Sequence, residues 1–230
     1  ISGNPDQCIV DGLGEQDLFN YESGENISSH INGITIQNGE NTVGCAIDFE
    51  NSSALVTNCV IRGCIHTAVD MDNSNAQFRD CVFESNNQAM NISTSNPWIT
   101  RCVFKGNSSD YGGAMYSVGS YPLITNCLFI DNSATDSGGA IEVNSDVATR
   151  VINCTFVNNS AGIEGGAINF KYLADPAIVV NSLFSGNSAP DEPHVHSGSD
   201  GSAEYCIFNG SVPTGLPLIN CHDLAPDFIG

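Results

Sequence analysis

Basic residues are scarce in this chain. Its 230 residues include only 6 Lys and Arg against 26 Asp and Glu, which gives a formal net charge of -20. So acidic a surface repels phosphate backbones and anionic bilayers, which excludes nucleic acid and membrane surfaces as partners. Cations, basic proteins and neutral glycans remain compatible with this charge.

Long apolar runs are absent as well. No stretch approaches the roughly 18 apolar residues of a membrane-spanning helix, and no charged segment leads into an apolar one as in a signal peptide. We therefore expect no membrane insertion. The sequence begins at Ile1 in the middle of a repeat pattern, so we expect it to be a piece of a longer or processed precursor.

Helical periodicity is missing too, and a repeat takes its place. The segment 122–141, PLITNCLFIDNSATDSGGAI, has looser copies along most of the chain. One column of matching positions is small or apolar throughout: Cys8, Ile34, Cys59, Cys81, Cys102, Cys127, Cys154, Ser182 and Cys206. A second column lies two residues later: Val10, Ile36, Ile61, Phe83, Phe104, Phe129, Phe156, Phe184 and Phe208. Because successive side chains of a strand alternate between faces, both columns should point inward.

A period between 21 and 28 residues with short strand-like runs predicts an all-β fold, a single-stranded parallel β-helix of about nine rungs. At about 4.8 Å per coil, the rod would be roughly 40 Å long. We expect one domain over 1–230, with less regular first rungs in 1–50 and regular rungs in 51–209. The tail 210–230 is rich in proline, which cannot donate to a strand ladder, and is expected to cap the last rung.

With NCxFxxNSA and GGAI located, the chain resembles the right-handed parallel β-helix repeats of the pectate-lyase-like superfamily. It is particularly similar to the GGAI and FxxN repeats of polymorphic outer membrane proteins, and its opening, CIVDG and INGITIQNG, resembles the first rungs of related bacterial surface proteins. The resemblance implies a right-handed coil, a secreted or cell-surface location, and an adhesive, scaffolding or glycan-related role. Polysaccharide-cleaving members of the superfamily use acidic calcium ligands and a basic residue on the outer face of one sheet.

The cysteine column allows two interpretations. Thiols stacked in register on parallel strands have β-carbons about 4.8 Å apart, whereas a disulfide needs about 3.8 Å, so free thiols in a dry core are favoured over a chain of bridges. Cys45 and Cys64 lie off the column and are the one pair to test for a bridge. Cys221 lies in the tail and has no assigned place.

Asparagines recur at the bend after the Phe strand. Stacked amides can hydrogen-bond along the axis of a solenoid and satisfy turn carbonyls, which predicts a buried Asn ladder with no ligand-binding role. Its members are Asn86, Asn107, Asn132, Asn158 and Asn187.

Four carboxylates form the sharpest functional signal. If Ile47 and Val69 face inward, then Asp48, Glu50, Asp70 and Asp72 face outward on two neighbouring rungs, within about 5 to 7 Å of one another. Calcium would relieve their repulsion, since it prefers oxygen ligands. A solvated acidic face is the simpler alternative.

An enzyme would need a base beside those acids. The basic residues lie on other strands or other rungs: Arg62, Arg79, Arg101, Lys105, Arg150 and Lys171. Lys171 is some four rungs away from the acidic group. The pattern therefore favours a non-enzymatic protein, with paired carboxylates for glycoside hydrolysis left open.

The outward position between the Cys and the Phe forms an apolar stripe, which is either a docking surface or a simple preference of strands for β-branched residues. Its members are Val60, Val82, Val103, Leu128, Leu183 and Ile207, with Thr155 at the same position of another rung.

His194 and His196 lie beside Asp191 and Glu192 in a segment, Pro193–His196, that we interpret as a loop excursion. They are either polar loop residues or ligands of a transition metal. Glycosylation sequons begin at several asparagines and matter if the source is a eukaryotic secretory pathway: Asn26, Asn51, Asn91, Asn107, Asn153, Asn158 and Asn209.

Two functional hypotheses follow. The first is a non-enzymatic extracellular or cell-surface β-helix, structural or adhesive, which contacts a protein or glycan partner or associates with itself. The second is a polysaccharide-binding or polysaccharide-cleaving module that uses calcium at Asp48, Glu50, Asp70 and Asp72.

Overall fold

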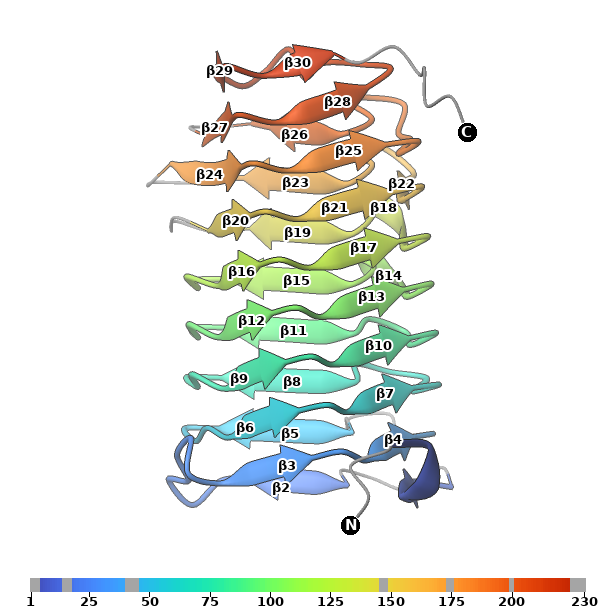
Figure 1. The fold of residues 1–230 in the computed structure, drawn as a ribbon, viewed down its shortest axis with the longest axis vertical. Coiled ribbons are helices and arrows are strands. Elements are labelled where there is room, and N and C mark those ends of the chain that lie inside the picture. Colours follow the sequence, from blue (N-terminus) through green and yellow to red (C-terminus); the bar gives the residue numbers. More distant parts are fainter. Residues whose placement is uncertain are drawn as a thin grey trace.

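The computed structural model describes residues 5–13, 18–39, 46–144, 149–172, 176–198 and 201–223. In these ranges the chain winds into a parallel β-solenoid whose strands stack in register along one axis (Figure 1). Helix is limited there to the 3-10 turn η1 (Pro5–Gln7), and no helix of the described chain is long and apolar enough to cross a membrane.

Three long sheets form the sides of the solenoid. Sheet A has ten strands: β1 (Ile9–Asp11), β4 (Thr35–Gln37), β7 (Val60–Arg62), β10 (Val82–Glu84), β13 (Val103–Lys105), β17 (Leu128–Ile130), β21 (Thr155–Val157), β25 (Leu183–Ser185), β28 (Ile207–Asn209) and β30 (His222–Asp223). Sheet B has eight: β2 (Phe19–Tyr21), β5 (Ile47–Glu50), β8 (Val69–Asp72), β11 (Met90–Ser93), β15 (Met115–Val118), β19 (Ile141–Asn144), β23 (Ile168–Lys171) and β26 (Val195–Ser197). Sheet C has nine: β3 (His30–Asn32), β6 (Leu55–Thr57), β9 (Gln77–Arg79), β12 (Trp98–Thr100), β16 (Leu123–Thr125), β20 (Arg150–Ile152), β24 (Ala177–Val180), β27 (Gly201–Glu204) and β29 (Leu218–Ile219).

Each turn passes from sheet B through sheet C to sheet A. The prediction of a parallel β-helix is therefore confirmed. The expectation of about nine rungs is slightly too high, because a complete turn needs a strand in all three sheets and sheet B has eight strands in the described chain.

Bends between sheets are made by residues with positive φ. In one turn, Asn126 (φ 55°) follows the sheet C strand and Asp131 (φ 56°) follows the sheet A strand. Asn and Asp enter the left-handed region more readily than most residues. The Asn of each Asn-Cys pair is thus the bend residue, and the Cys that follows it turns into the core.

The two predicted columns line the interior from Ile36 and Cys59 onward, whereas Cys8, Val10 and Ile34 of the first rungs are only half-buried. Phe83, Phe104, Phe129, Phe156 and Phe184 are fully buried, and their rings stack nearly parallel with centroids 4.7–4.9 Å apart. That spacing equals the rise of one coil, so each turn adds one ring to the aromatic stack.

The cysteine thiols are free, as the strand geometry predicted. Burial raises the pKa of Cys206 to about 12, which keeps that thiol neutral. Cys221 extends the column by one place, because its Sγ accepts a hydrogen bond from the backbone N–H of Cys206 at 3.4 Å. Cys45 lies outside the described residues, and Cys64 carries a free thiol.

The Asn ladder is present with one correction. In the rung after Asn132 the buried member is Asn159, whereas the predicted Asn158 is exposed and has a φ of 55°. Every ladder amide before Asn187 donates to the amide oxygen of the next rung and to a backbone carbonyl, as Asn132 does to Asn159 Oδ1 (2.9 Å) and Phe104 O (2.9 Å). The bend residue and the ladder residue are adjacent, so a pair of asparagines leaves their order ambiguous in sequence.

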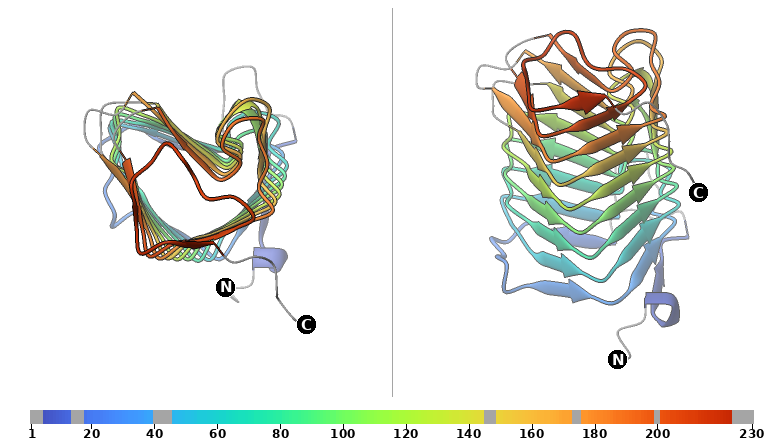
Figure 2. Two further views of the ribbon diagram at one scale, coloured as in Figure 1. Left: turned by 90° about the horizontal axis from the view of Figure 1, so that it is seen from above. Right: turned by 45° about the horizontal axis from the view of Figure 1, so that its top comes forward.

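A hook interrupts the coil between sheet A and sheet B. We use this name for residues 108–113, 133–139, 160–166 and 188–193 of four successive rungs, which include sheet D: β14 (Ser108–Tyr111), β18 (Ser133–Ser137) and β22 (Ser160–Ala161). The segment between ladder residue and following alanine is short in Asn86–Ala89 and much longer in Asn132–Ala140. Seen from above, the hook curls outward beside sheet B (Figure 2, left).

Paired glycines close the hook against the sheet. Gly138 has a φ of 64°, and a β-carbon on Gly139 would lie 2.1 Å from the carbonyl oxygen of Gly166. No larger residue fits at Gly139 without moving the backbone of the next rung. The GG of the repeat is therefore the closure of the hook.

The last rungs stay in register. Val195 pairs with Ile168, and His194 is buried with its Nδ1 3.3 Å from Asn187 Nδ2. The interpretation of Pro193–His196 as a loop excursion was therefore wrong. Beyond β28, Leu216 joins the hydrophobic core and β29 and β30 begin a further turn.

Candidate functional site

The outer face of sheet B carries a row of polar side chains beside the hook. Glu142 on β19, Asn169 on β23 and His196 on β26 occupy successive positions in register, with Tyr116 on β15 next to Glu142. The hook contributes Glu164 and Asp191, which pair with each other through an isolated β-bridge. Two elements that are separate in sequence thus converge on one corner.

A groove of about 310 Å³ runs along this corner. Its lining residues are Tyr111 from the hook, and Tyr116, Glu142, Asn144, Lys171 and Tyr172 from β15, β19, β23 and the bend that follows. The Tyr111 and Tyr116 rings lie 6.3 Å apart, and Tyr172 is 70% exposed. The groove therefore offers aromatic faces together with one carboxyl and one ammonium group.

Glu142 is the most unusual residue of the groove. It is 1% exposed, and neither carboxyl oxygen has a hydrogen-bond partner within the described part of the chain. Burial raises the pKa of Glu142 to about 7, although Asn169, Ser137 and the charge of Lys171 act in the opposite direction. Near neutral pH both protonation states of this group are populated, as the pKa of a general acid or base requires.

Lys171 links the sheet to the hook. Its Nζ lies 3.3 Å from Glu164 Oε1, and the side chain is largely buried. Partial burial lowers the pKa of Lys171, but the charges of Glu142 and Glu164 outweigh this and the net shift is upward. Lys171 therefore stays protonated and supplies a fixed positive charge at the edge of the groove.

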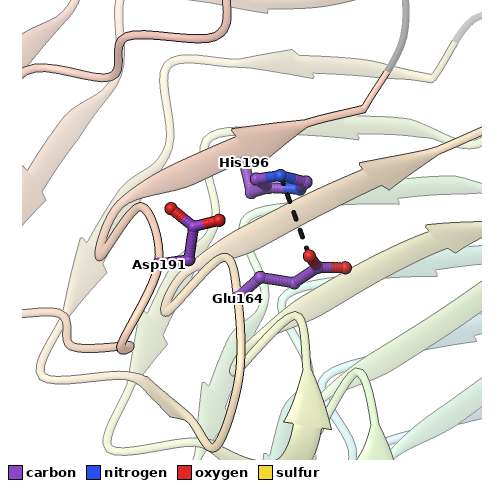
Figure 3. A group of neighbouring side chains, drawn as sticks. All are labelled: Glu164, Asp191 and His196. Atoms are coloured by element: carbon purple, nitrogen blue, oxygen red, sulfur yellow. Dashed lines mark ion pairs between the residues drawn. The ribbon is translucent and has the colours of Figure 1, made fainter.

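A second cluster lies beside this pair. Glu164, Asp191 and His196 each place one possible ligand atom within 4.8 Å of the others (Figure 3). His196 Nε2 is 3.8 Å from Glu164 Oε2, and His196 Nδ1 is 2.7 Å from Asn169 Oδ1. Two carboxylates and an imidazole can bind a cation or a hydrogen-bonding ligand.

Comparison with known families agrees with this architecture. A family model described as a right-handed beta helix region matches residues 20–171, about two thirds of the chain. The chain belongs to the right-handed β-helix family. A search of curated proteins found no match to it. The match covers sheet B from β2 to β23 and much of the hook, including Glu142, Glu164 and Lys171.

The predicted acidic patch lies on the same sheet of this right-handed β-helix, on β5 and β8, away from the four rungs that carry the described hook segments. Asp48 pairs with Asp70 and Glu50 with Asp72 in register. Asp70 accepts a hydrogen bond from Asn91 at 2.9 Å. Within the described residues, the cluster of possible metal ligands is Glu164, Asp191 and His196, and it does not include these four carboxylates. Calcium binding at the patch stays a prediction.

The predicted apolar stripe lies on the outer face of sheet A. Its side chains are half-buried and follow one another in register from Val60 to Ile207. Thr155 interrupts it between Leu128 and Leu183. Docking through this stripe stays a prediction.

Six of the predicted glycosylation sites have at least partly exposed asparagines: Asn26, Asn51, Asn91, Asn153, Asn158 and Asn209. Asn107 is fully buried, and its Nδ2 donates to Phe83 O and to Asn132 Oδ1. Its amide nitrogen is therefore inaccessible, and the expectation of glycosylation at Asn107 was wrong.

Sequence reasoning missed the groove although its parts were visible. The alternation of Ile141–Asn144 puts Glu142 on the outer face of a strand, and outward residues are normally solvated, so nothing in the sequence marks this glutamate as buried. Lys171 is indeed far from Asp48 and Asp70, yet it lies in register beside Asn144, two residues from Glu142. The long segment before each GGA was the one available signal, since it marks the rungs where a hook can cover the sheet.

Proposed function

We propose that this right-handed β-helix is a glycan-binding module that works outside the cell, with the groove between sheet B and the hook as its binding site. One observation carries the proposal: tyrosines, a buried carboxyl group and an ammonium group line a single groove. Aromatic rings pack against apolar faces of a ligand, and a few polar groups fix its orientation. The net charge of -20 favours neutral glycans over anionic ones.

The adhesive role that the family resemblance implies would follow from such binding. An open groove on the side of a rod can hold a segment of a long chain, whereas an enclosed pocket accepts only its end. Neither the acidic patch nor the apolar stripe is needed for this role.

A binding screen with matched tyrosine variants tests the proposal. The purified chain is titrated against a panel of neutral and acidic polysaccharides, and Tyr116→Ala is compared with Tyr121→Ala, a tyrosine 49% exposed outside the groove. Tyr116→Ala should weaken binding by roughly tenfold, while Tyr121→Ala should leave it unchanged. Absence of binding to any member of the panel, or equal effects of the two variants, would refute the groove as a glycan site.

A second candidate function is hydrolysis of the bound glycan. Glu142 favours it, because a carboxyl group with a pKa of about 7 can protonate a leaving oxygen near neutral pH. Cleavage is established if reducing ends are released from the bound polysaccharide and if Glu142→Gln loses this release but still binds. Binding without release of reducing ends would support the non-enzymatic adhesive module.

A further inference from the structure

The cluster beside the groove brings together three side chains from three separate segments of the chain. Glu164 comes from the hook, Asp191 from the hook of the next rung, and His196 from β26 of sheet B (Figure 3). Their ligand atoms lie within 4.8 Å of one another. Ligand atoms around a tetrahedral zinc ion are about 3.4 Å apart, so small side-chain rotations bring the three into range.

Asn169 sets the orientation of the imidazole. This amide is fully buried, and its Nδ2 donates to Glu164 Oε1 at 3.2 Å, which directs its Oδ1 toward His196 Nδ1 at 2.7 Å. In a neutral imidazole Nδ1 then carries the proton and Nε2 presents its lone pair to the carboxylates. Metal-binding histidines are commonly held in this way, by a carbonyl oxygen that accepts from the nitrogen remote from the metal.

Neighbouring side chains also orient the carboxylate of Glu164 toward the cluster. Its Oε1 accepts from both Asn169 and Lys171, which leaves Oε2 as the atom that faces His196. The backbone around it is held from both sides, since Gly138 N–H donates to Glu164 O and Gly165 N–H donates to Asp191 O, each at 3.1 Å. The ligand atoms are thus carried by rigid neighbouring rungs.

The charge around the cluster favours a cation. Glu164 and Asp191 bring two carboxylates, and the buried Glu142 lies near enough for the charge of Glu164 to disfavour its ionisation. Lys171 is paired with Glu164 Oε1, whereas Glu164 Oε2 is the oxygen near His196. A lone pair from Nε2 directed at two carboxylates is repulsive unless a proton or a metal ion lies between them.

The geometry points to a binding site for a divalent first-row transition metal ion such as zinc. Its ligands are Glu164 Oε2, an oxygen of Asp191 and Nε2 of His196. Imidazole with carboxylates suits zinc, whereas calcium takes oxygen ligands alone. Three protein ligands leave a coordination position for water or a ligand group, as in zinc sites that act on substrates. This inference does not rest on the glycan proposal.

Calorimetric titration of the metal-stripped 230-residue chain with zinc chloride at pH 7.5 tests the site. We expect one zinc ion bound per chain through this cluster, loss of that binding in His196→Ala, and a 10- to 100-fold loss of affinity in Asn169→Leu. His66→Ala is the matched control, because His66 is exposed and lies at rungs without the long hook. Circular dichroism confirms that each variant is folded.

Thiols also bind zinc, so only the binding that His196→Ala removes is assigned to this site. Identical titrations of the starting protein and His196→Ala would show that zinc does not bind at this cluster, and would overturn the proposal. Displacement of the bound zinc by an equal concentration of calcium would overturn the choice of metal.

Discussion

Cysteine serves in this protein as a small apolar residue. Six thiols of the column are at most 3% exposed, each near a backbone carbonyl of its own or the preceding rung: Cys59, Cys81, Cys102, Cys127, Cys154 and Cys206. Buried thiols in apolar surroundings are neutral and inaccessible, so they are unreactive.

We therefore predict that these six thiols resist Ellman's reagent in the native protein and react together on unfolding. Cys8 and Cys221, which are half-buried, should react first. Time-resolved labelling followed by mass spectrometry identifies the order. Rapid native labelling of Cys102 or Cys127 would show that the core is open to solvent.

Ionisation of Glu142 should make the stability depend on pH. Burial raises its folded-state pKa to about 7 from an ordinary value of 4.5, with the charge of Glu164 acting in the same direction and Lys171 opposing it. Between these values the folded protein keeps a proton that the unfolded chain has lost. Stability from this group is therefore full below pH 4.5 and falls by up to about 3 kcal/mol as the pH rises to 7.

Urea unfolding of Glu142→Gln between pH 4 and pH 8 measures this fall. The variant should gain stability over the starting protein at pH 8 and little at pH 4. Glu50→Gln, which removes an exposed carboxylate of the same sheet, should show no such gain. Parallel pH profiles for the starting protein and Glu142→Gln would contradict the assignment.

Tyr205 occupies a bend position where other rungs have Asn. Its φ is 54° and its side chain is 56% exposed, so the strained backbone is not offset by burial of the ring. We expect Tyr205→Asn to raise the free energy of unfolding by roughly 1 kcal/mol. Thermal melts should show no comparable rise for Tyr121→Asn, where φ is not positive.

At the scale of elements, the Asn ladder joins the sheet A bends of successive rungs. Asn132 Oδ1 accepts from the N–H and the Nδ2 of Asn107, and its Nδ2 donates to Phe104 O and Asn159 Oδ1. Asn132→Ala leaves these buried groups unpaired and should cost about 3 kcal/mol. Denaturant unfolding measures the loss, with Lys105→Ala as an exposed control in a neighbouring rung. An equal effect of the two changes would contradict the ladder.

Strands and bends were predictable from sequence because they rest on local chemistry. The alternation of Cys and Phe with outward residues sets the faces, and a residue in the left-handed region, often Asn, sets each bend. Which of Asn158 and Asn159 joins the ladder was not predictable, since both have the side chain that a ladder needs. Only the register with Asn132 and Asn187 separates them.

The hook was beyond such reasoning for another physical reason. Sheet B presents the same kind of outward position at Asp70 and at Glu142, yet one is partly exposed and the other is 1% exposed. The difference is whether the chain between sheet A and sheet B is long enough to fold over the sheet. Burial of Glu142, and with it the raised pKa, is therefore a tertiary property of several rungs.

At the scale of the whole molecule, a solenoid carries its function on its sides. The rungs contribute similar cores, so differences between rungs appear on the outer faces and in inserted segments. The rungs of the acidic patch and the rungs of the groove share sheet B (Figure 1), and the described hook segments belong to the rungs of the groove. The carboxylates that stand out in the sequence lie on an open face, whereas the groove combines residues that are inconspicuous there.

Amide chemical-shift perturbation maps a bound glycan onto the protein directly, with the polysaccharide that binds in the screen as the ligand. A chain of 24.2 kDa is within reach of this measurement. We predict that the largest shifts cluster at Tyr111, Tyr116, Glu142 and Lys171. Shifts centred on Asp48 and Asp70, or on the apolar stripe of sheet A, would contradict it.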